Sequence, residues 1–180
     1  PNAVARGGND AILSLAMSDG ISLDTGGFDL TVNGLLQLAG TGTDLTIGDI
    51  DSTVTADSVA VQSGAEILLE DGVIAVIEET GTGLLDIDAG GGIAGSGTIG
   101  LSDSGLGAAT TLMTNDGTIR ASHLGVSVGA PPAGSLRINA ADPANARLNL
   151  DGGGINAVLQ VTRNQTLDIN VTLTDPYSGF

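Results

Sequence analysis

Apolar and polar residues alternate with a period of two along most of the chain. Side chains of a strand point to opposite faces in turn, so this alternation predicts β-strands with aliphatic residues on one face and small or charged residues on the other. The longest such run is 167–173. The same pattern is found in 30–32, 45–47, 59–61, 85–87, 99–101, 126–128, 136–138 and 148–150.

Two segments depart from simple alternation. Residues 9–18 fit a short helix as well as a strand, because their apolar positions suit either period. Residues 73–77 form a continuous apolar run, which predicts a strand buried on both faces. Helical spacing is otherwise nearly absent, and the chain is predicted to be all-β.

The spacing of the strands points to a repeating architecture. Strong strand starts recur at Leu30, Leu45, Ile67 and Leu85, at unequal intervals. The intervals vary around the roughly 20 residues that are typical of a β-solenoid coil, and the chain would then make roughly eight or nine coils. Asp-Gly turn signals such as Asp19-Gly20 separate the strands.

A β-sandwich or jelly roll is the alternative fold, because it also contains many short strands. Aromatic residues are only 2% of the chain, whereas Ile, Leu, Val and Ala supply the apolar positions. Such aliphatic residues stack well on successive coils, so we favour the solenoid. We expect one domain over residues 1–180, as a segment of a longer chain, with a protruding loop near 129–135, where Pro131 and Pro132 interrupt the pattern.

The charge excludes one class of partner. Twenty-one acidic residues face five basic ones, for a net charge of −16, and all five basic residues are arginines. Nucleic-acid binding needs clustered basic residues, so we expect no nucleic-acid partner. Cysteine is absent, which excludes a disulfide scaffold. No apolar run reaches the roughly 18 residues of a membrane span, so no transmembrane segment is predicted.

Several turn-strand units resemble those of a known class of surface protein. Residues 81–88, 95–100 and 115–119 look like coils of autotransporter passengers and filamentous-haemagglutinin-like adhesins. The resemblance is one of style, without a diagnostic motif, and transfers no functional residue. It implies a right-handed parallel β-helix displayed on the bacterial cell surface, with the role of a stem.

Paired carboxylates are the candidate chemistry. Asp49 and Asp51 flank Ile50, and Asp86 and Asp88 flank Ile87. In a strand, residues i and i+2 share a face about 6.5–7 Å apart. The favoured interpretation is a solvated acidic face. The alternative is calcium, which takes six to eight oxygen ligands and is the one cofactor that this set of four carboxylates predicts.

The arginines recur along the second half of the chain, as Arg120, Arg137, Arg147 and Arg163. On a solenoid some of them would line one flank and pair with outward aspartates. Exposed pairs of this kind contribute under about 1 kcal/mol each.

Together these features predict a non-catalytic structural or adhesive stem, or an assembly subunit, of a bacterial extracellular surface protein. Its partners would be neighbouring segments of the same chain or identical subunits, giving a filament or array, and surface glycans. Two alternatives remain: a calcium- or glycan-binding module, and a tailspike-like polysaccharide hydrolase or lyase, since paired carboxylates at this spacing serve inverting glycosidases.

Overall fold

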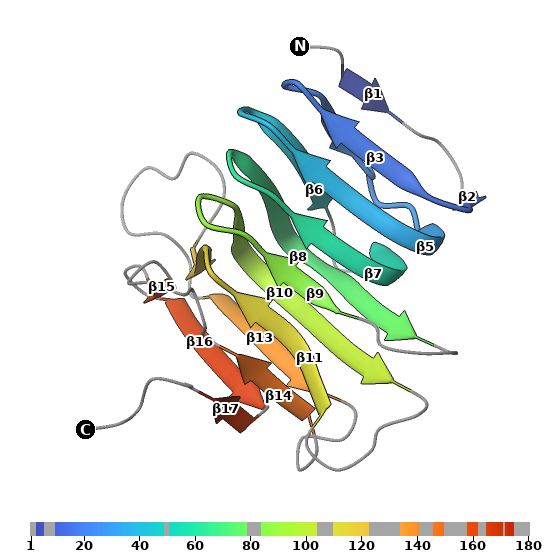
Figure 1. The fold of residues 1–180 in the computed structure, drawn as a ribbon. Coiled ribbons are helices and arrows are strands. Elements are labelled where there is room, and N and C mark those ends of the chain that lie inside the picture. The colour runs from blue at the N-terminus through green and yellow to red at the C-terminus, as the bar shows by residue number, and fades with distance from the viewer. Residues whose placement is uncertain are drawn as a thin grey trace.

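The chain folds into a β-solenoid with three parallel ladders around one core (Figure 1). The structure, a computed structural model, describes residues 3–5, 10–48, 51–78, 84–103, 110–122, 134–140, 146–149, 158–161, 165–170 and 172–174. The pairings between the described strands are parallel. A sandwich or jelly roll pairs its strands antiparallel, so the solenoid prediction is confirmed.

Each coil passes through the three ladders in turn. The first ladder contains β1 (Ala3–Ala5), β4 (Ser22–Asp24), β6 (Thr43–Gly48), the first parts of β8 (Ala65–Glu78) and β10 (Gly92–Asp103), β12 (Thr118–Ala121) and β15 (Val158–Val161). The second contains β2 (Asp10–Ile12), the first parts of β5 (Leu30–Ala39) and β7 (Thr53–Val61), the second parts of β8 and β10, β13 (Gly134–Ala140) and β16 (Gln165–Asn170). The third contains β3 (Leu15–Ser18), the second parts of β5 and β7, β9 (Leu85–Ile87), β11 (Thr110–Asn115), β14 (Ala146–Asn149) and β17 (Thr172–Thr174).

The described part of each ladder is therefore seven rungs deep, fewer than the predicted eight or nine coils. The length of a coil is the number of residues between register partners on neighbouring rungs of the first ladder. The first described coil runs from Ala3 to Ser22, whereas the last runs from Thr118 to Val158 and is much longer. The predicted number was wrong because it assumed a constant coil of roughly 20 residues. The handedness of the coil stays a prediction.

The core consists of stacked aliphatic columns. Inward side chains at equivalent rungs lie above one another, so each contacts the same kind of residue on the coils before and after it. A buried Leu or Ile contributes about 1.5–3 kcal/mol relative to its exposed state. The columns include Leu45, Ile67, Ile93 and Ile119 on the first ladder, Val54, Ile74, Ile99 and Ile138 on the second, and Leu36, Val59, Leu85 and Met113 on the third.

Two local predictions are settled by the structure. The sequence of residues 9–18 fits a helix or a strand, and the structure shows strands: Asp10–Ile12 form β2 and Leu15–Ser18 form β3. The run 73–77 is not buried on both faces. Ile74 and Val76 point inward and are buried, whereas Val73, Ala75 and Ile77 alternate with them on the outward face of β8, where Ile77 is 38% exposed.

The predicted loop near 129–135 lies mostly outside the described residues. Its last two residues, Gly134 and Ser135, begin strand β13. Phe28, one of the few aromatic residues, is 41% exposed at the corner between β4 and β5, so it contributes little to the core.

Candidate functional site

Two of the four predicted metal ligands lie side by side on the third ladder. Asp86 in β9 and Asp88 just after it alternate with the buried Leu85 and Ile87. The sequence prediction that this pair shares the outward face is confirmed.

The environment of Asp86 disfavours its charged form. Partial burial raises the pKa of the Asp86 carboxyl above its usual 3.8, and the negative charges of Asp88 and Asp116 raise this pKa further. Asp116 follows β11, the next rung of the ladder, where its N–H donates to the carbonyl of Ile87 at 2.7 Å. The structure therefore adds a third carboxylate that the sequence pairs did not include.

The other predicted ligands do not join this group. Asp51 is exposed at the corner before β7, which leads into the second ladder, whereas Asp86 and Asp88 face outward from the third. Asp49 lies outside the described residues. Within the described ranges, no three or more His, Cys, Asp or Glu side chains are grouped so that they could hold a metal ion. Calcium at Asp49, Asp51, Asp86 and Asp88 thus stays a prediction.

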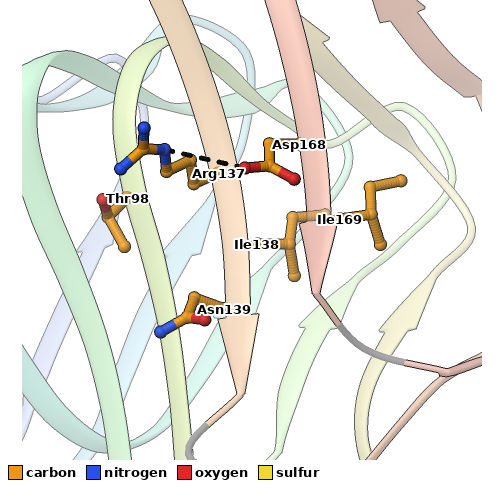
Figure 2. Close-up of a pocket in the computed structure, with 6 residues that line it drawn as sticks. All are labelled: Thr98, Arg137, Ile138, Asn139, Asp168 and Ile169. Atoms are coloured by element: carbon orange, nitrogen blue, oxygen red, sulfur yellow. Dashed lines mark ion pairs between the residues drawn. The ribbon is translucent and has the colours of Figure 1, made fainter. Parts of the chain in front are cut away.

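A shallow hollow opens on the outer face of the second ladder (Figure 2). Thr98, Arg137 and Asp168 occupy one outward column on successive rungs of β10, β13 and β16. The hollow has a volume of about 380 Å³. Its lining consists of Thr98, Arg137, Ile138, Asn139, Asp168 and Ile169.

An ion pair crosses this hollow. Nε of Arg137 lies 3.8 Å from Oδ2 of Asp168, and the two side chains are 62% and 61% exposed. An exposed pair at this distance contributes under about 1 kcal/mol to stability, so the fold does not depend on it.

A second hollow of about 330 Å³ lies on the first ladder. Glu66, Gly92 and Thr118 are register partners on three successive rungs, and the glycine leaves the middle rung without a side chain. Arg120 reaches back across this gap, and its Nη2 donates to Oε1 of Glu66 at 3.3 Å.

Burial shifts the pKa of the Glu66 carboxyl more than the ion pair with Arg120 does. Burial raises the pKa of the Glu66 carboxyl above its usual 4.5. The guanidinium of Arg120 lowers this pKa, and the carboxylate of Asp44 raises it. Desolvation thus outweighs the attraction of the arginine.

The predicted pairing of arginines with outward aspartates is confirmed for Arg137. For Arg120 the partner is a glutamate far away in the sequence, which the spacing of the arginines does not reveal. Arg163 lies outside the described residues, and the pairing of Arg147 stays a prediction.

No protein-family model, no curated protein and no solved structure matches the chain. Its fold class is shown by the strand pairings themselves. The part of the chain that the structure describes contains no helix long and apolar enough to cross a membrane.

Proposed function

We propose that the chain is a non-catalytic structural stem, with an adhesive role, in a bacterial extracellular surface protein. One observation supports this most directly: three parallel ladders, each seven rungs deep, run through the whole described stack. In Figure 1, β1 lies at one end of that stack and β17 at the other. Such a continuous frame is suited to holding other parts of an assembly at a fixed separation.

The ends of the stack provide the means of extension. Among the described pairings, β1 bonds only to β4, and β15 only to β12. A strand bonded on one side presents unpaired N–H and C=O groups to further strands. Neighbouring coils of the same chain, or identical subunits, would continue the ladders and give a rod or filament.

The surface chemistry is consistent with that role. The net charge of −16 keeps solenoids apart side by side, so growth along the axis is favoured over lateral aggregation. Bacterial surface display is supported by the turn-strand units 81–88, 95–100 and 115–119 together with the solenoid fold, and an adhesive role by the polar hollow on the outer face of the second ladder.

Electron microscopy of the native protein, with and without a calcium chelator, tests this proposal. Rods or filaments with a regular axial repeat are expected in both conditions. Dispersal by the chelator would identify calcium bridges between acidic faces, while the stem itself would stand. Small discrete particles in both conditions, at protein concentrations up to the solubility limit, would overturn the stem.

A further inference from the structure

The two charged groups of the ion pair in Figure 2, the guanidinium of Arg137 and the carboxylate of Asp168, leave room for one atom of a ligand between them. At 3.8 Å, Nε of Arg137 and Oδ2 of Asp168 lie beyond the roughly 3.6 Å at which a side-chain contact no longer counts as a direct hydrogen bond. A hydroxyl oxygen about 2.9 Å from both atoms fits this triangle. It would accept from the guanidinium N–H and donate to the carboxylate, which is the pattern that one hydroxyl group satisfies completely.

The rest of the lining matches a ring that carries several hydroxyls. The Thr98 hydroxyl and the Asn139 amide can each donate and accept, and they lie on the same ladder as the pair. Ile138 is buried in the core and Ile169 packs against the core, so both side chains point away from the outward column. The side chains that reach into the hollow from the outer face are therefore polar, which suits a ligand whose edges carry several hydroxyls.

The charges select a neutral ligand. Arg137 and Asp168 carry one positive and one negative charge, so the pair has no net charge, and the chain as a whole carries −16. An anionic ligand would meet a repulsive field. The volume of about 380 Å³ lies at the lower end for small-molecule sites, which admits one sugar unit at a time.

We propose that this hollow binds one unit of an uncharged oligo- or polysaccharide, with a ligand hydroxyl bridging Arg137 and Asp168. Thr98 and Asn139 contact the neighbouring hydroxyls. The site extends the proposed adhesive role, and the stem does not depend on it, because the stem is tested by particle shape and not by affinity.

The hollow on the first ladder supplies a matched control. It also contains an arginine, an acid and a threonine, but Arg120 already donates to Glu66 at 3.3 Å. A direct bond leaves no gap for a bridging hydroxyl, so this pair is not expected to bind the same ligand.

The test is saturation-transfer difference NMR with neutral probes, namely maltohexaose, cellohexaose and mannohexaose, and with trigalacturonate as the anionic comparison. The method observes the saccharide and therefore works on a monomer or a filament. At least one neutral probe is expected to bind with a Kd on the order of 1 mM, as a few hydrogen bonds in a shallow site would give.

Three single variants locate the binding. Arg137→Gln and Asp168→Asn are each expected to weaken it at least about fivefold, since a charge-assisted hydrogen bond is lost. Arg120→Gln is expected to change it less than about twofold. Arg137 and Asp168 are mostly exposed, so their variants should fold, and circular dichroism checks this.

Each of three results would overturn the site. The first is no transfer to any neutral probe at about 10 mM, tenfold above the expected Kd. The second is an equal or larger loss in Arg120→Gln than in the Arg137 and Asp168 variants. The third is tighter binding of trigalacturonate than of every neutral probe.

Discussion

Replacing Gly95 by alanine should destabilise the solenoid strongly, whereas the same change at Gly100 in the same strand should not. Gly95 has a φ of +125°, which L side chains rarely adopt. A Cβ there would overlap the carbonyl oxygen of Leu69, its partner on the preceding rung, and would lie 2.9 Å from the carbonyl carbon. These are backbone atoms of the ladder, so they cannot move aside without breaking the pairing.

The expected magnitude combines two effects. A strained backbone conformation costs about 1–3 kcal/mol, and forced overpacking costs about 1–3 kcal/mol more. We therefore expect Gly95→Ala to lower the free energy of unfolding by about 3–4 kcal/mol. At Gly100 a Cβ would meet its nearest neighbour, the carbonyl oxygen of Ile74, at 3.8 Å. Gly100→Ala should thus be neutral or stabilising by up to about 1 kcal/mol.

Urea unfolding of both variants and the wild type, followed by far-UV circular dichroism, measures these free energies. Equal slopes of the three curves would establish that the unfolded and folded states are comparable. A difference between the two variants of less than about 1 kcal/mol would refute the reasoning, because the energies above separate them by several times that amount.

Two further predictions concern a buried hydroxyl pair and a raised pKa. Ser52 donates to the carbonyl of Phe28 at 3.0 Å and accepts from Thr25 at 2.8 Å. Ser52→Ala should lower the free energy of unfolding by about 1–3 kcal/mol, because it leaves the buried hydroxyl of Thr25 without this partner, and adding Thr25→Val should recover part of the loss. Strictly additive losses in urea unfolding would contradict this. The folded-state pKa of Asp86 is raised, so its ionisation destabilises the fold as pH rises through that pKa. Asp86→Asn should therefore raise the melting temperature near neutral pH and lose this advantage in acid; a lower melting temperature near neutral pH would count against the assignment.

The sequence predicts the core better than the stacking order. Alternation identifies the inward residues, and two of the strand starts, Leu45 and Ile67, do stack as register partners on successive coils. Leu30 and Leu85 belong to other ladders, where they stack on Val54 and Val59. All three ladders share one apolar pattern, so spacing alone does not say to which ladder a strand belongs.

The two surface hollows could not be predicted from the sequence for a related reason. Glu66 and Arg120 are far apart in the sequence, and they meet only because two successive coils of equal length bring Gly92 between Glu66 and Thr118. An error of one residue in either coil would turn the wrong side chain outward. The outward position of Asp86 and Asp88, by contrast, needed only the local period of two, and it was predicted correctly.

The coils that join successive rungs of the first ladder differ in length, so the height of the solenoid does not depend on the number of residues in each coil. Each rung adds about 4.8 Å, whether the coil that reaches it is as short as the one from Ala3 to Ser22 or as long as the one from Thr118 to Val158. Residues inserted at a corner would widen the solenoid and leave its height unchanged. A single residue deleted within a strand would instead turn the remainder of that strand inside out. Foreign peptides inserted at the corners would therefore be displayed at known heights along the solenoid axis, one rung spacing apart.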